Sequence, residues 1–328
     1  MKPLQLTYGG EVYDRTEALY SGTVSPEGVD LTYVRTGIED LFWRQGHYGE
    51  FDLSEFSFGA YLSTLADDPA GFVAIPVFPS RAFRHSAIYV AAPSDLVDAS
   101  QLAGATIGIP EWSQTATLWV RGILADHYGV DLEKVDWRTG GLEQPGRVDK
   151  SKVAPPTSCS IEPIDARSTL IEELTAGRLD AVISARSPGT ALRAGAVRRL
   201  FSNPRQVEAD YFAATNIFPI MHVVTMRREL AEAHRWLPVT LWNAFEAARA
   251  LGRRPLLDHL YCATSLAWEA EYATEESELL GDAFAYGIEP NRPTLETIIR
   301  YGAEQGFCDK GLLPEDLFFE TTRTRARI

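Results

Sequence analysis

Short apolar runs and helix-like segments alternate along the first part of the chain. The apolar or alternating runs predict strands at Leu4–Tyr8, Val29–Val34 and Phe51–Phe56. Helices are predicted between and after them, from Arg15 to Ser21 and from Ser57 to Ala66. This order of strands and helices is typical of an α/β protein with a mostly parallel sheet.

A second block repeats this organisation. Strands are predicted at Thr106–Ile109, Val135–Arg138 and Ala181–Ser184, and a helix is predicted at Ala116–Tyr128. The apolar run Ile217–Met226 predicts a strand that returns to the first block, and the pattern after it is helical.

The sequence therefore predicts two α/β domains that the chain crosses between near residues 90 and 220. The first domain is expected to comprise residues 1–92 and 220–328, and the second residues 93–219. Within the second domain, Thr139–Pro163 is rich in Gly, Pro, Ser and charge, which predicts a long exposed loop. Clefts between domains are favoured ligand sites, so the site is expected there.

The chain is acidic, with a formal net charge of −14 over 328 residues. Such a surface repels a phosphate backbone, so nucleic-acid binding is not expected. No apolar run approaches the roughly 18 residues that a membrane span needs. The N-terminal residues show no signal-peptide pattern, and the expected location is the cytoplasm.

Cysteine and histidine patterns predict a site without metal or cofactor. The three cysteines, Cys159, Cys262 and Cys308, are far apart and form no CxxC motif. The six histidines form no HxH or HExxH motif.

Basic residues lie between two predicted core strands in the segment Ile75–Val90. Arg81, Arg84 and His85 separate the apolar runs Ile75–Phe78 and Ala87–Ala92. Such groups are costly to desolvate, which indicates a use for them. Arginine binds carboxylates with two parallel hydrogen bonds, and histidine transfers protons near neutral pH. The segment predicts a site for a small acid; the alternative is a salt-bridge cluster between domains with a structural histidine.

Predicted helix N-termini supply further candidates, because free backbone N–H groups there bind anions. Ser57 begins a helix in the first domain, and Ser113, Gln114 and Thr115 begin one in the second. Plain helix capping is the alternative for each. Three further candidates follow predicted strands or turns, with ion pairing as the alternative: Arg15, Ser80 and Arg186. His222 lies within the predicted strand Ile217–Met226, with core packing as its alternative.

Five segments together resemble the 4,5-dihydroxyphthalate decarboxylase family, and the motif FPSRAFRH within them is long and chemically unusual. The segments are Tyr13–Leu31, Ser54–Leu62, Ile75–Val90, Leu102–Val130 and Phe218–Val224. The resemblance implies a fold like that of type II periplasmic binding proteins, with a mixed sheet flanked by helices in each domain. It also implies a carboxy-lyase that converts a dihydroxyphthalate to protocatechuate and carbon dioxide.

The resemblance also implies roles for the candidates. His85 is the expected proton donor, Arg81 the carboxylate clamp, and Arg84 or His222 a supporting group. The partner is then a small aromatic carboxylate. Because the fold also serves transport receptors, a solute-binding protein or sensor for such an acid stays open as the alternative.

Aromatic residues near the C-terminus leave the oligomeric state open. Core packing accounts for such residues in most proteins, and burial in a homo-oligomer interface is the other use. They are Trp236, Trp242, Phe245, Tyr261 and Trp268.

Overall fold

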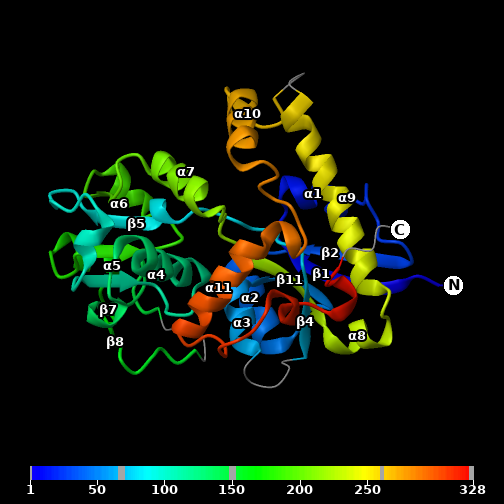
Figure 1. The fold of residues 1–328 in the computed structure, drawn as a ribbon, viewed down its shortest axis with the longest axis horizontal. Coiled ribbons are helices and arrows are strands. Elements are labelled where there is room, and N and C mark those ends of the chain that lie inside the picture. Colours follow the sequence, from blue (N-terminus) through cyan, green and yellow to red (C-terminus); the bar gives the residue numbers. More distant parts are fainter. Residues whose placement is uncertain (1, 66–70, 148–152, 259–261, 325–328) are drawn as a thin grey trace.

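Two β-sheets with helices on their faces organise the chain (Figure 1). The computed structural model describes residues 2–65, 71–147, 153–258 and 262–324. The first sheet has the strand order β2-β1-β3-β11-β4. Its strands are β1 (Leu4–Gly10), β2 (Val29–Arg35), β3 (Leu53–Ser57), β4 (Phe72–Ile75) and β11 (His222–Arg227).

The second sheet contains the strands between the two crossings, in the order β10-β5-β9-β6-β7-β8. They are β5 (Ile88–Ala91), β6 (Thr106–Ile109), β7 (Asp136–Thr139), β8 (Ser160–Pro163), β9 (Ala181–Ile183) and β10 (Val197–Arg199).

Both sheets are mixed, as the family resemblance implied, whereas the order of strands and helices alone predicted a mostly parallel sheet. In the first, β1 is parallel to β2 and β3, whereas β11 is antiparallel to β3 and β4. In the second, β6 is parallel to β7 and β9, whereas β5 is antiparallel to β9 and β10. Strand β5 belongs to the second sheet although it precedes residue 92. The proposed domain boundaries themselves stay a prediction.

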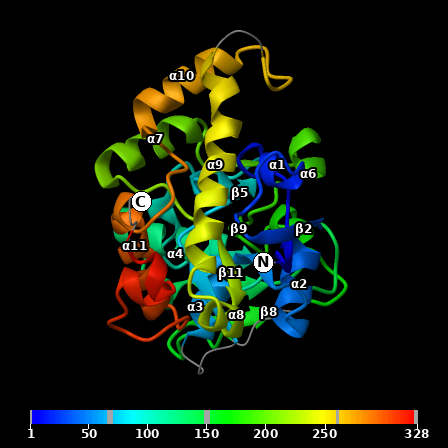
Figure 2. The ribbon, with the colours of Figure 1, turned by 90° about the vertical axis from the view of Figure 1, so that its right-hand side faces the viewer.

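Helices connect and cover the strands. They are α1 (Asp14–Tyr20), α2 (Ile38–Tyr48), α3 (Phe58–Thr64), α4 (Thr115–Tyr128), α5 (Leu170–Thr175), α6 (Gly189–Arg193), α7 (Pro204–Thr215), α8 (Arg228–Ala233), α9 (Leu237–Asp258), α10 (Glu269–Leu280) and α11 (Arg292–Glu304). Helix α9 packs along α1, and α10 projects with the end of α9 beyond the rest of the molecule (Figures 1 and 2). No helix within the described ranges is long and apolar enough to cross a membrane.

Several predicted elements were placed wrongly. Strand β4 ends at Ile75 instead of beginning there, because Pro76 has no N–H for the ladder. Part of the predicted 139–163 loop is strand β8, which pairs with β7. Helix α7 was not predicted; its only buried residue is Tyr211, so it has almost no apolar periodicity. The last residue of the predicted 57–66 helix, Ala66, lies outside the described ranges.

One large apolar core includes residues of both sheets, and helix α4, which follows β6, packs against α3 and α11. Trp119 of α4 donates its indole N–H to the carbonyl of Ile220 at 2.9 Å, just before β11. Arg121 of α4 is fully buried, donates to the Gln305 amide oxygen at 2.6 Å and stacks 3.6 Å above the Trp112 ring. These contacts fix the N-terminus of α4 beside the first sheet.

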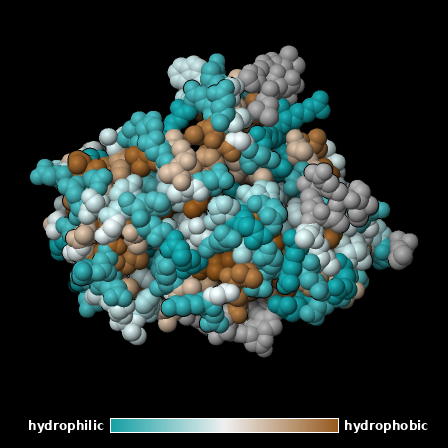
Figure 3. Space-filling view, in the orientation of Figure 1, coloured by the Kyte–Doolittle hydropathy of each residue, from teal (hydrophilic) through white to brown (hydrophobic). Residues whose placement is uncertain are grey.

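The aromatic residues of the C-terminal region divide between the core and the surface. Trp242 and Phe245 are buried, whereas Trp236 and Trp268 are exposed. Tyr261 lies outside the described residues. The face shown in Figure 3 is mostly hydrophilic with separated apolar areas. A homo-oligomer stays a prediction.

Candidate active site

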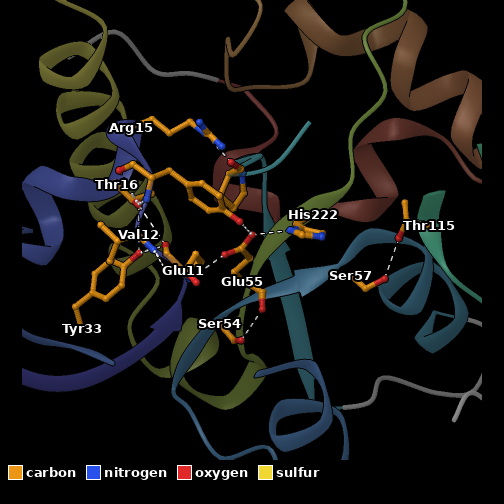
Figure 4. A network of polar contacts seen from close by, with 12 residues as sticks. Glu11, Val12, Arg15, Thr16, Tyr33, Ser54, Glu55, Ser57, Thr115 and His222 are labelled. Carbon is orange, nitrogen blue, oxygen red and sulfur yellow. Dashed lines mark hydrogen bonds and ion pairs between the residues drawn. The ribbon is translucent and has the colours of Figure 1, made fainter. Parts of the chain in front are cut away.

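A buried carboxylate lies at the centre of the first sheet. Glu55 is the middle residue of β3, between β1 and β11, and its exposed fraction is 0%. Its Oε1 accepts hydrogen bonds from the Tyr13 hydroxyl at 2.8 Å and from His222 Nδ1 at 2.6 Å, and its Oε2 accepts the Glu11 backbone N–H at 3.2 Å (Figure 4). These donors compensate for the loss of water around a buried carboxylate.

His222 begins β11 and lies opposite Ser57 in the ladder. Its side chain is 16% exposed, and its ring packs edge-on against Phe42 at 4.9 Å. A carboxylate in its ionised form only accepts hydrogen bonds, and towards that form of Glu55 Nδ1 is the donor. No described residue hydrogen-bonds to Nε2, which is therefore the ring nitrogen left for a ligand.

Arg15, predicted as a ligand contact, lies beside this network. Its guanidinium is between the rings of Tyr13 and Phe284, 4.2 and 4.3 Å from their centroids. Its Nε donates to the Pro79 carbonyl at 2.5 Å, and Asp14 pairs with Nη1 at 2.9 Å. The Tyr13 ring thus separates a cation from the Glu55 carboxylate.

Arg81 lies between the loop before α11 and two aromatic rings. It donates to the Ala285 carbonyl at 3.3 Å and to the Asn291 side chain, and it packs over the Phe78 ring. Its Nε is buried, and no described residue accepts a hydrogen bond from it. Burial lowers the pKa of Arg81 to about 9, so the side chain is still cationic at neutral pH. No described carboxylate lies within ion-pair distance of it.

Arg84 is also partly buried and, in the described part of the chain, forms no ion pair. Its Nε is 3.1 Å from the Met221 sulfur, and burial lowers its pKa to about 10. It is a second cation close to β11, which Met221 precedes.

His85 has very different surroundings from His222. It begins a short 3-10 helix (His85–Ala87), is 3% exposed, and packs against Tyr211, Phe201 and Tyr128 at centroid distances of 5.0, 5.9 and 6.2 Å. Burial, and then the charge of His127, lower the pKa of His85 to about 4. The ring is therefore neutral at physiological pH, and its contacts are not shared with the Glu55 network.

The N-termini of α3 and α4, which carry the candidates Ser57 and Thr115, meet in the structure. The two hydroxyl oxygens are 2.8 Å apart, and Thr115 Oγ1 also accepts the Gly59 N–H at 2.9 Å. Ser113 is buried, and the side-chain amide oxygen of Gln114, Oε1, is buried without a hydrogen bond to any described residue. Gln114 is thus the acceptor that a ligand hydroxyl could use.

Replacing Thr115 by Val is expected to lower the free energy of unfolding by about 1–3 kcal/mol, because it leaves the buried Gly59 N–H without an acceptor. Urea denaturation measures the change. Thr274→Val is the matched control, since that hydroxyl bonds within exposed α10. A loss no larger than that of the control would contradict this reading of the contact.

The other two candidates contribute differently. The Ser80 carbonyl accepts the N–H groups of Met221 and His222 at 2.9 and 3.2 Å, so Ser80 supports the segment that enters β11. Arg186 has a largely exposed side chain and pairs with Glu39 of α2 at 3.3 Å. It lies on the surface between the two sheets.

The hydrogen-bond network around Glu55 contains or borders some of the predicted site residues, and it includes two residues that were not predicted. Arg15, Ser80 and His222 lie in or beside one network. Glu55 and Tyr13, which the prediction missed, form its centre. A carboxylate inside the short strand Leu53–Ser57, which is buried over most of its length, was the available signal, because buried carboxylates require donors. Within the described ranges no group of three or more His, Cys, Asp or Glu side chains could hold a metal ion.

A pocket of about 280 Å³ lies between α1, α9 and α10. Its walls include Phe284, Tyr272 and Arg253, and Arg15 is the only predicted site residue among them. The pocket therefore borders the Glu55 network through Arg15 without containing it.

Comparison with solved structures identifies the class of fold. The chain superposes on the periplasmic aliphatic sulphonate binding protein of Escherichia coli with a TM-score of 0.53 and 15% identity, covering 100% of this chain and 95% of that one. The periplasmic sulfonate-binding protein of Methylobacillus flagellatus KT gives a TM-score of 0.59 at 11% identity, covering 97% and 92%. The structure thus has the periplasmic-binding-protein fold, as predicted; identities this low show the fold alone.

Sequence comparison defines the family. A 4,5-dihydroxyphthalate decarboxylase of Comamonas testosteroni is 33% identical over 320 residues, which cover 97% of each chain. A second one, of Pseudomonas putida, is 34% identical over 215 residues, covering 65% of this chain and 83% of that one. A scan against models of protein families found no match. The chain belongs to the 4,5-dihydroxyphthalate decarboxylase family, which confirms the resemblance.

Proposed function

We propose that the protein removes one carboxylate from 4,5-dihydroxyphthalate without oxidation, giving protocatechuate and carbon dioxide. The observation that carries this proposal is the 33% identity to a decarboxylase of that name over 97% of both chains. The polar network around Glu55 and His222 supports it, because it supplies a proton-transferring group on the segment whose residue Ile220 pairs with Arg81.

The chemistry sets three requirements. Each carboxylate of the substrate is para to a hydroxyl group, so partial removal of that phenol proton pushes electrons toward the ring carbon that bears the carboxylate. A proton then adds to this carbon. The carbon–carbon bond breaks, its electron pair restores the aromatic ring, and neutral carbon dioxide leaves. The site therefore needs a proton donor, an acceptor at the phenol and cations for the retained carboxylate.

We assign the proton donor to His222 and not, as expected from sequence, to His85. A neutral ring enclosed by aromatic side chains is poorly suited to donate a proton to a ligand, whereas His222 is partly exposed. The retained carboxylate is assigned to Arg81, with Arg15 and Arg84 as neighbouring cations. Gln114 is the proposed acceptor for a ring hydroxyl, and Ser57, Ser80, Ser113, Thr115 and Arg186 stay proposed substrate contacts.

Turnover tests the function directly. Purified protein is incubated with 4,5-dihydroxyphthalate while the ultraviolet spectrum and released carbon dioxide are followed, with and without a chelator. Equal amounts of protocatechuate and carbon dioxide in both samples would support the proposal and the metal-free site. Tight binding without product would instead support a solute-binding protein. The cytoplasmic location stays a prediction, which cell fractionation tests.

Arg81→Met is expected to lower kcat/KM by about 10- to 100-fold, since a hydrogen bond to a charged group contributes roughly 1.5–3 kcal/mol. Steady-state kinetics measures the loss. Arg178→Met, which removes an exposed arginine paired with Glu173, controls for charge, and thermal melting shows whether the Arg81 variant is folded. If the folded Arg81→Met variant has the same kcat/KM as the control, Arg81 does not bind the substrate.

A further inference from the structure

The hydrogen bonds of Glu55 constrain the orientation of His222. Oε1 is shared by the His222 ring and the Tyr13 hydroxyl, and Oε2 is occupied by the Glu11 N–H, so donors from three segments fix both oxygens. Glu55 is on β3 and His222 on β11, and the ladder pairs β3 with β11 over five residues. The carboxylate and the imidazole are therefore held by rigid neighbouring strands.

Tyr13 strengthens this arrangement. Burial, and then the charge of Glu55, raise the pKa of the Tyr13 phenol well above its ordinary value, so the hydroxyl stays protonated and donates. Its ring also packs against the Arg15 guanidinium at 4.2 Å. Glu55 thus has a second permanent donor beside His222.

We propose that Glu55 is the positioning residue of the proposed decarboxylation. It holds Nδ1–H of His222, so that in the imidazolium form the hydrogen on Nε2 is the proton given to the ring carbon. The ring is left neutral with hydrogen on Nδ1, and Nε2 takes up the next proton from water. Glu55 itself does not touch the substrate, because all its donors are protein groups and its side chain is fully buried. This inference rests on the proposed function for its catalytic consequence, but the tautomer of His222 can be measured without turnover.

The decisive variant is Glu55→Gln. An amide offers only one acceptor oxygen, so it cannot satisfy all three donors, and its NH2 group favours the opposite tautomer of His222. We expect kcat to fall on the order of 10²-fold with little change in KM, since only the proton transfer is affected. Glu55→Asp keeps the charge and is expected to recover part of kcat.

Glu269→Gln is the matched control. Glu269 is also buried and accepts two backbone N–H groups at 2.6 Å, but it lies in α10, away from His222.

The structural readout is the nitrogen spectrum of the full-length protein labelled with 15N-histidine, in which the signals absent from His222→Gln identify His222. Wild type and Glu269→Gln should show hydrogen on Nδ1, and Glu55→Gln a larger population with hydrogen on Nε2 alone. A neutral wild-type ring with hydrogen on Nε2, or an unchanged tautomer and kcat in Glu55→Gln, would overturn the inference. The wild-type spectrum decides this even if Glu55→Gln does not fold. If wild type shows the expected tautomer but no decarboxylation, the proposed function alone has failed.

Discussion

Replacing His222 by Gln is expected to lower kcat for 4,5-dihydroxyphthalate by about 10²- to 10⁴-fold, the usual contribution of general acid–base catalysis. Glutamine can still accept or donate a hydrogen bond near Glu55, but it cannot carry a transferable proton at neutral pH. KM should change less than kcat, because the carboxylates of the substrate are assigned to arginines. Steady-state kinetics with carbon dioxide release as the second readout measures both constants.

His47→Gln is the control for His222→Gln. His47 is exposed at the end of α2 and stacks on Trp43, so its loss leaves the Glu55 network intact. Its kcat should match that of wild type. If His222→Gln retained near-normal turnover, the proton would have to come from another group, and the assignment of His222 would fail.

The positions of most strands could be predicted from local patterns because strands in this chain are short, apolar and separated by clear turns. The mixed sheets followed only from the family resemblance, and the order of the strands was not predicted. The failures have identifiable physical causes. Pro76 ended β4 where the apolar run suggested a beginning, and α7 has too little apolar periodicity to be detected. Asn203 before Pro204 was the remaining signal for α7, because a capping residue followed by proline is typical of a helix start.

The site could be predicted less completely, since its geometry depends on contacts between distant segments. The sequence shows two histidines next to apolar strands but cannot show what surrounds each ring. His85 is among aromatic rings, and His222 is beside a carboxylate 167 positions earlier in the chain. Tyr13 and Glu55 are likewise joined across 42 positions. Only the antiparallel pairing of β11 with β3 brings the pair Glu55 and His222 together.

Protonation of His85 is expected to destabilise the fold in mild acid. Its pKa is lowered from 6.5 to about 4 in the folded protein, so between these values the unfolded chain binds a proton that the folded chain does not. The free energy of unfolding must therefore fall as the pH decreases from about 6.5 to about 4, and the linkage relation gives about 3 kcal/mol for this one group. Above pH 6.5 both states are neutral and the contribution is constant.

His85→Gln removes this titration. The pH dependence of the free energy of unfolding therefore tests the surroundings assigned to His85 independently of the kinetic test of His222. Urea denaturation at several pH values from 7 to 4 should show a smaller loss of stability in the variant than in wild type, even if the variant is less stable at pH 7. His127→Gln is the matched control, because His127 is exposed and contributes only the smaller charge effect on His85. Parallel curves for wild type and His85→Gln would mean that His85 is accessible to protons in the folded state. In that case His85 could donate a proton to the substrate. If it is the donor, kcat of His85→Gln must fall as strongly as we expect for His222→Gln.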